Sequence, residues 1–156
     1  MTNFSQADAG RATPPPAEPI VPVSGLTASK PSFSVSLDSL PVEGGIDPAY
    51  GTVLWKTLIN GTAADPKEFI LGVAEFGPGG VLPPHRHAPA EFYFGLDGDG
   101  VVTIDGVAHP IRPGVALYVA SYAEHATVAG PKGLRIVYGF SEPSFEGIEY
   151  HFSPLP

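Results

Sequence analysis

The order of apolar and polar residues in this chain favours β-strands over helices from residue 33 onwards. Phe33, Val35 and Leu37 alternate with serines, a pattern typical of a strand with one face in water. No stretch of ten or more residues carries a convincing helical period. Apolar runs that predict further strands lie at residues 53–59, 68–76, 91–96, 101–104, 107–111, 115–119, 125–128, 134–140 and 148–152. Short strands at such regular spacing predict an all-β protein, built as a sandwich or a barrel.

Turn signals separate the apolar runs. Asn60-Gly61 and Asp105-Gly106 are dipeptides that favour tight β-hairpins. The segments 77–80 and 97–100, rich in glycine, interrupt the pattern in the same way and predict turns. Glycine and proline number 19 each in 156 residues, yet hydrophobic residues still make up 43% of the chain. This composition suits many short strands around a single core.

Residues 1–31 differ from the rest of the chain because they combine many prolines with alanine, serine and threonine. Such a segment buries little apolar surface, so we expect a disordered or loosely draped N-terminal arm, followed by one domain at residues 32–156. Within the arm, the short apolar run at residues 20–23 is a candidate edge strand for pairing with a partner subunit.

Charge and composition exclude several classes of partner. The net charge is −8, and the eight lysines and arginines are scattered along the chain, so neither nucleic acid nor an anionic membrane is an expected partner. No apolar run reaches the length of a membrane-spanning helix, and the first residues lack the pattern of a secretory signal. The chain has no cysteine, which is compatible with the cytosol. We therefore expect a cytoplasmic protein without disulfides or thiolate ligands.

The candidate functional residues are concentrated in one segment. Side chains two positions apart in a strand share a face, so His85 and His87 are expected to point the same way, and so are Glu91 and Tyr93. A carboxylate buried beside imidazoles is costly without a cation. Together with the more distant His125, the segment predicts a site for one divalent transition metal, namely Fe(II), Mn(II), Ni(II), Co(II) or Zn(II). His109 and His151 lack the spacing to join it.

The spacing of these residues resembles the motifs of the cupin family. Gly79, His85, His87, Glu91 and Gly98 match every defined position of the first cupin motif. The second motif is partly kept: its glycine and histidine are Gly114 and His125, whereas its proline, glycine and asparagine are replaced by Ala120, Tyr122 and Ala129. The resemblance covers about residues 50–140 and implies a small antiparallel β-barrel of jelly-roll type with an interior metal. Cupins are commonly dimers whose N-terminal strands pack across the interface, so a homodimer is expected.

A finer resemblance concerns the activity. The two histidines, the glutamate with Tyr93 two residues beyond it, and the distant His125 resemble the small cupin lyases that split dimethylsulfoniopropionate into dimethyl sulfide and acrylate. In that family the metal holds the carboxylate of the small-molecule substrate and a tyrosinate removes a proton, which implies that Tyr93 is the catalytic base. Aromatic side chains would surround the sulfonium, and the candidates are Trp55, Phe92, Tyr118 and Tyr122. The fold alone leaves open another metal-dependent enzyme (a dioxygenase, isomerase or decarboxylase) or a non-catalytic small-molecule-binding cupin.

Overall fold

The structure, a computed structural model, describes residues 33–45, 47–61 and 69–154. The expected arm at residues 1–31, with its candidate edge strand at residues 20–23, lies outside the described residues. The strands are β1 (Glu43–Gly44), β2 (Leu54–Ile59), β3 (Ile70–Phe76), β4 (Val81–Arg86), β5 (Glu91–Ile104), β6 (Val107–Ile111), β7 (Ala116–Val119), β8 (His125–Phe140) and β9 (His151–Phe152). Three short 3-10 helices accompany them, η1 (Leu37–Ser39), η2 (Pro48–Tyr50) and η3 (Phe145–Gly147). No helix among the described residues is long and apolar enough to cross a membrane.

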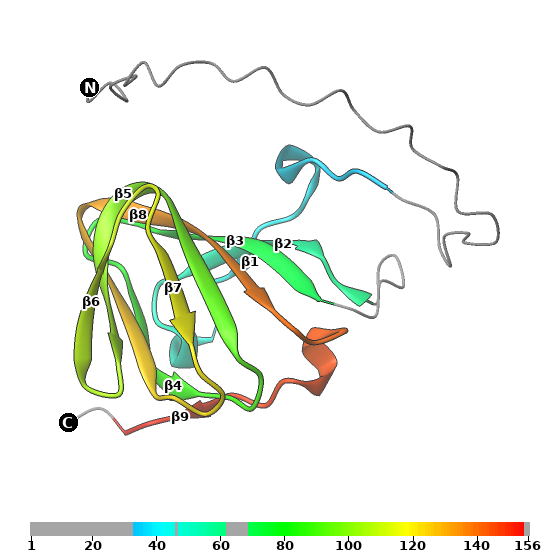
Figure 1. Cartoon of the computed structure of the whole chain (residues 1–156). Coiled ribbons are helices and arrows are strands. Elements are labelled where there is room, and N and C mark those ends of the chain that lie inside the picture. Colours follow the sequence, from blue (N-terminus) through cyan, green and yellow to red (C-terminus); the bar gives the residue numbers. More distant parts are fainter. Residues whose placement is uncertain (1–32, 46, 62–68, 155–156) are drawn as a thin grey trace, which may run out of the picture. The chain divides into compact units, whose positions relative to one another are not determined.

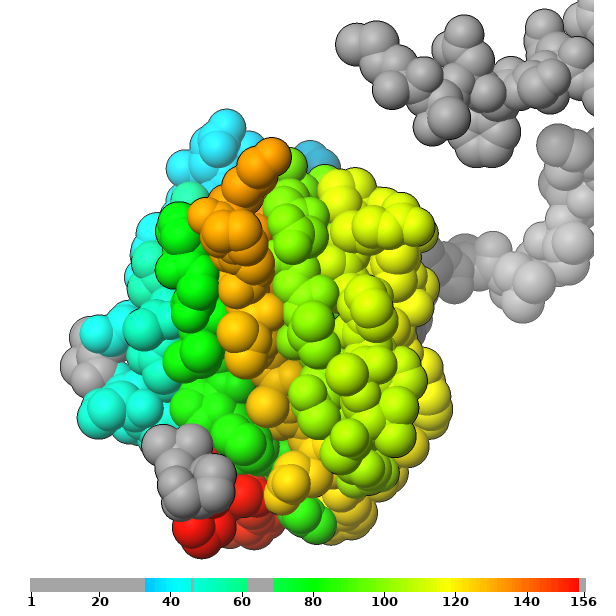
Figure 2. All heavy atoms as spheres, turned by 90° about the vertical axis from the view of Figure 1, so that its left-hand side faces the viewer, coloured from blue at the N-terminus to red at the C-terminus, as the bar shows by residue number. Residues whose placement is uncertain are grey.

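Two long strands organise the sheet, and every strand pair in it is antiparallel. β5 and β8 pair with each other along most of their length. On its other edge β8 pairs with β4 and then with β3, while β5 pairs with β7 and then with β6. The sheet curls around an apolar core (Figure 1), and its outer surface shows β2, β3, β8 and β5 side by side (Figure 2). The predicted antiparallel β-barrel is confirmed.

A glycine-rich bend runs across the central pair of strands. The segment 97–100, for which the sequence predicted a turn, lies inside β5, where the pairing register with β8 shifts twice. Gly98 has a φ of +69°, and a Cβ added there would lie 2.1 Å from the carbonyl oxygen of Gly133. Only glycine permits this approach in this conformation. The predicted pairs of short strands, 91–96 with 101–104 and 125–128 with 134–140, are therefore wrong, because each pair is one long bent strand.

Of the two predicted hairpins and the predicted C-terminal strand, the structure confirms only part. The hairpin at Asp105-Gly106 is confirmed, with Ile104 paired to Val107 across it. No tight hairpin forms at Asn60-Gly61, because β2 ends at Ile59 and β3 begins only at Ile70. The predicted strand at residues 148–152 is reduced to the two residues of β9.

The strand predicted at residues 33–37 is also wrong, because η1 begins at Leu37. Its N-terminus is capped by the side chain of Ser36, which accepts a hydrogen bond from the backbone N–H of Asp38. Serine favours such caps, and an alternating pattern forms a strand only where another strand is available to pair with it.

Candidate metal centre

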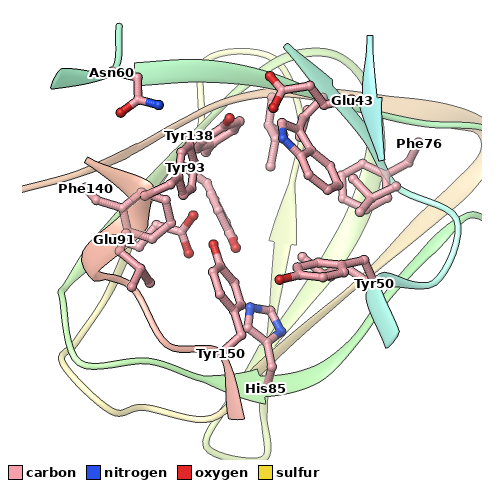
Figure 3. Close-up of a pocket in the computed structure, with 17 residues that line it drawn as sticks. Glu43, Tyr50, Asn60, Phe76, His85, Glu91, Tyr93, Tyr138, Phe140 and Tyr150 are labelled. Atoms are coloured by element: carbon pink, nitrogen blue, oxygen red, sulfur yellow. The ribbon is translucent and has the colours of Figure 1, made fainter. Parts of the chain in front are cut away.

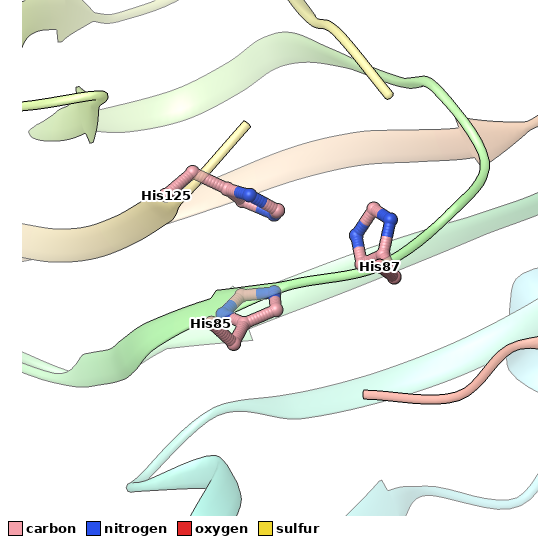
Figure 4. A group of neighbouring side chains, drawn as sticks. All are labelled: His85, His87 and His125. Carbon is pink, nitrogen blue, oxygen red and sulfur yellow. The ribbon is translucent and has the colours of Figure 1, made fainter. Parts of the chain in front are cut away.

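Three buried histidines come together from two neighbouring strands. His85 lies on β4, His87 follows the end of that strand, and His125 is the first residue of β8 and the register partner of His85. Each side chain is about 1% exposed. Their ligating nitrogen atoms all lie within 4.8 Å of one another, and Figure 4 shows the three rings facing a common space. The structure thus brings the three predicted histidines into one group that could hold a metal ion.

Backbone carbonyls set the orientation of all three rings. The Nδ1 atom of His85 lies 2.8 Å from the carbonyl oxygen of Pro83. His87 and His125 make the same contact, at 2.9 Å, with the carbonyl oxygens of Pro89 and Ala123. A carbonyl can only accept, so each Nδ1 carries the proton and each Nε2 keeps a lone pair. This is the tautomer that a metal-binding histidine needs.

Glu91 adds a buried negative charge to the group. Its Oε2 atom lies 3.4 Å from Nε2 of His87 and 3.2 Å from Nε2 of His125, and the carboxylate is 5% exposed. None of these three atoms has a hydrogen-bond partner among the described residues. Lone pairs on imidazole and carboxylate repel each other unless a cation or a proton lies between them.

The pKa shifts describe the charge state of the centre. Burial, together with the neighbouring His125, lowers the pKa of His85 from 6.5 to about 4, so this ring is neutral at pH 7 and free to act as a ligand. Burial opposes the ionisation of Glu91, but the neighbouring imidazoles of His125 and His87 outweigh burial and lower the pKa of the carboxyl group. Three imidazoles facing one buried carboxylate fit a single divalent transition metal.

Tyr93 shares the inner wall with Glu91, as the alternation along β5 predicted. Its side chain is 3% exposed, and its ring centroid lies 6.3 Å from that of His125. Burial and the nearby Glu91 carboxylate raise the pKa of the phenol well above 10. Tyr93, Glu91 and His85 all line a cavity of about 310 Å³. Figure 3 shows the hydroxyl groups of Tyr93 and Tyr150 and the carboxylate of Glu91 pointing into it.

The predicted substrate-binding residues occupy different places. Trp55 lines the cavity. Tyr118 and Tyr122 do not line it, and they are 71% and 58% exposed. Both tyrosines precede His125 closely in the sequence, but Tyr118 lies opposite Phe92 on an exposed face of the sheet. Tyr122 lies in the loop before β8 with a φ of +60°.

Sequence reasoning missed three cavity tyrosines, Tyr50, Tyr138 and Tyr150. Tyr138 could have been found, because it alternates in phase with the buried Ile136 and Phe140 on β8. Tyr50 belongs to the short helix η2 and Tyr150 precedes the two-residue strand β9, so neither has a period that marks it as inward-facing.

Several contacts hold the segment that contains Tyr150 next to the three histidines. The ring of Tyr150 stacks on His85, with centroids 5.5 Å apart and an interplanar angle of 27°. β9 follows it and pairs with β4, and the backbone N–H of Ser153 donates to the carbonyl oxygen of Pro84 at 2.9 Å. The Ser153 hydroxyl and Arg86 both donate to the carboxylate of Glu124. These contacts make Tyr150 a fixed part of the cavity wall.

Comparisons with known proteins agree with this geometry. The family model of the cupin domain matches residues 72–137. Dimethylsulfoniopropionate lyase DddW from Ruegeria pomeroyi is 60% identical over 123 residues, which cover 79% of this chain and 81% of that protein.

Solved structures show the same fold. The polyketide cyclase RemF from Streptomyces resistomycificus matches 80% of this chain and 87% of its own at 21% identity, with a TM-score of 0.67. A structure of the DMSP lyases RdDddP and RnDddQII matches 74% of this chain and 63% of its own at 15% identity, with a TM-score of 0.61. The match to the cupin domain and the 60% identity to DddW agree with the architecture and the three buried histidines. The chain therefore belongs to the cupin family, as a relative of DddW.

Proposed function

We propose that this protein is a metal-dependent lyase that cleaves dimethylsulfoniopropionate into dimethyl sulfide and acrylate. The observation that carries the proposal is the position of the three-histidine group at the cavity: His85, the buried carboxylate of Glu91 and the buried Tyr93 line it. The ligand atoms of His87 and His125 lie within 4.8 Å of that of His85. The 60% identity to the lyase DddW supports the same reaction. The fold alone does not choose among cupin activities, so the proposal depends on these residues and on that relative.

His85, His87, His125 and Glu91 would hold one divalent cation. Their donor set, three neutral imidazoles and one carboxylate, suits Fe(II), Mn(II), Ni(II), Co(II) or Zn(II) and leaves room for a ligand from the substrate. The bound cation would supply positive charge that attracts the substrate carboxylate and lowers the pKa of a neighbouring phenol.

Tyr93 is the proposed general base. As a phenolate it would accept a proton from the carbon next to the substrate carboxylate. The electron pair of that C–H bond then forms the double bond of acrylate, and the C–S bond breaks with its electrons on sulfur, which leaves as neutral dimethyl sulfide. Tyr93 ends the step protonated and must release the proton before the next turnover. The side chain of Tyr93 is 3% exposed, so the phenol is shielded from bulk water.

Aromatic side chains are available for the sulfonium end of the substrate. Trp55 and Tyr50 both line the cavity, and their ring centroids lie 5.5 Å apart. The faces of such rings attract cations that cannot donate hydrogen bonds. Trp55 therefore keeps its predicted substrate-binding role in the proposal, and Tyr50 joins it in place of the exposed Tyr118 and Tyr122.

The test is a product assay on purified full-length protein loaded with each metal in turn. Acrylate and dimethyl sulfide should form in equal amounts, with and without oxygen, and the reaction should stop when a chelator removes the metal. Consumption of oxygen, or the absence of acrylate with every metal, would contradict the proposed lyase.

The proposal includes a homodimer. Its support is the cluster of exposed large apolar side chains on β5 and β7, where Phe92, Phe94 and Tyr118 are 42%, 40% and 71% exposed. Such a patch is typical of an interface. Analytical ultracentrifugation should show a dimer, and a monomer at all concentrations would contradict this part of the proposal. A cytoplasmic location stays a prediction from the composition.

A further inference from the structure

A second carboxylate, that of the exposed residue Glu43, lines the cavity. This residue begins β1 and lies beside Trp55, its register partner on β2, and both line the cavity. In Figure 3, Glu43 and His85 lie at opposite ends of the view, and Glu91 lies to one side of the line between them. The end of the cavity away from the histidines therefore carries a negative charge next to an aromatic ring.

Contacts with β2 hold Glu43 in this place. Its Oε1 atom accepts a hydrogen bond from the backbone N–H of Thr57 at 3.1 Å and another from the Thr57 hydroxyl at 2.8 Å. The same hydroxyl lies 3.3 Å from the phenol oxygen of Tyr138, which also lines the cavity. Within the part of the chain that the structure describes, no lysine, arginine or histidine forms an ion pair with Glu43. Both hydrogen bonds from Thr57 go to Oε1, so neither of them occupies Oε2.

We propose that Glu43 selects ligands with a positively charged end, by holding that charge beside Trp55 while the carboxylate of the same ligand lies at the histidines. This role of Glu43 rests on the proposed lyase function. It would make Glu43 the residue that distinguishes a sulfonium from an uncharged group of the same shape. A sulfonium has no N–H or O–H to donate, so a directional hydrogen bond cannot recognise it. A carboxylate next to an aromatic face recognises its diffuse charge instead.

The test compares two ligands of nearly identical shape. One is trimethylammonio-propionate, and the other is its uncharged analogue, in which a carbon atom replaces the nitrogen. Both keep the carboxylate, and they differ by a single positive charge. An amine is a poorer leaving group than a sulfide, so binding can be measured by calorimetric titration into full-length, metal-loaded protein.

Two substitutions separate the charge of Glu43 from its structural contacts. Glu43→Gln keeps an oxygen that can accept from Thr57 but loses the charge, and it should lose roughly fivefold in affinity for the cationic ligand, with no change for the uncharged one. Glu43→Asp keeps the charge with a shorter reach to Thr57, and it should retain the preference for the cation. Glu75→Gln is the matched control, because Glu75 is an exposed carboxylate on β3 that does not line the cavity.

Two results would overturn the proposal: an unchanged preference for the cationic over the uncharged ligand in Glu43→Gln, or a similar loss of that preference in Glu75→Gln. With dimethylsulfoniopropionate itself, Glu43→Gln should raise KM and leave kcat nearly unchanged. Failure of the lyase function is distinguishable, because wild-type protein that releases no acrylate would contradict that function while the two ligands still report on Glu43.

Discussion

His85 and His125 are register partners on β4 and β8, and their ring centroids lie 4.1 Å apart. Strand pairing thus joins the two cupin motifs, whose histidines His85 and His125 are separated in the chain by the whole of β5, β6 and β7. The metal centre is therefore built into the sheet itself, and the position of the ligands depends on the same hydrogen bonds that hold the fold together.

Replacement of His87 by alanine should remove most of the bound metal and leave the fold intact. The ring of His87 lies beyond the end of β4, so strand pairing does not depend on it, whereas the ion would lose one of its few ligands. Elemental analysis and circular dichroism of the purified variant provide the measurement. His109→Ala, on β6 away from the centre, is the matched control and should keep its metal. A well-folded His87→Ala protein with stoichiometric metal would refute the ligand assignment.

Replacement of Tyr93 by phenylalanine should lower turnover of dimethylsulfoniopropionate by roughly 10²-fold or more, the usual contribution of a positioned general base. The change removes one oxygen atom and keeps the buried ring, so metal content and Tm should barely change. Tyr118→Phe removes the same atom from a side chain that is 71% exposed, and its turnover should equal that of the wild type. Full activity in Tyr93→Phe would remove the main support for a tyrosinate mechanism.

The metal-free protein should lose stability as the pH falls from about 6.5 to about 4. Burial lowers the pKa of His85 from 6.5 to about 4, so the unfolded chain binds a proton in this range that the folded protein does not bind. The free energy of unfolding therefore decreases on acidification, by about 3 kcal/mol at most from this residue.

Urea unfolding with a chelator present, at several pH values across that range, measures the effect. His85→Gln lacks the titrating group and should show a weaker dependence on pH. Equal pH dependence in the two proteins would show that His85 does not take part in the acid sensitivity.

Replacement of Gly98 by alanine should destabilise the protein by about 3 kcal/mol or more, because the added Cβ meets the backbone of the neighbouring strand. Gly114→Ala is the matched control: Gly114 also has a positive φ, +82°, but a Cβ there would have no atom within 4 Å. That variant should lose only about 1–2 kcal/mol, the cost of the left-handed conformation itself. Chemical denaturation gives both values, and equal losses would mean that the close approach at Gly98 is not essential to the bend.

A protein that begins at Pro31 should stay folded and keep its metal. Every residue assigned to the metal centre and the cavity lies after this position, and the preceding segment has the composition of a disordered arm. Circular dichroism and elemental analysis of the shortened protein test the prediction. Global unfolding would show instead that residues 1–30 contribute to the core.

The inner wall of the metal centre could be predicted because its signal is local. In a strand the side chains alternate, so Glu91 and Tyr93 had to face the same way once the strand existed. The bend at Gly98 could not be predicted in the same way. Glycine is favoured in a turn and in a bulge for the same conformational reason, and only the partner strand decides between them. Two long strands were therefore divided into four short ones.

The cavity wall was harder to predict than the ligands. Tyr118 and Tyr122 are close to His125 in sequence, yet they are exposed, because closeness along the chain does not determine which face a side chain occupies. Tyr150 comes from a distant segment that returns to pair with β4. Such a contact depends on tertiary structure, and no short pattern in the sequence encodes it.

The carbonyl groups that hold the three imidazoles have a consequence for the evolution of the site. They belong to the backbone within two residues of each histidine, and two of the three are carbonyls of prolines, Pro83 and Pro89, whose backbone is conformationally restricted. Replacement of a surrounding side chain does not remove a backbone carbonyl. Substitutions of surrounding side chains can therefore change the shape of the cavity and the molecule that it accepts. The backbone contacts that orient the three imidazole rings stay the same.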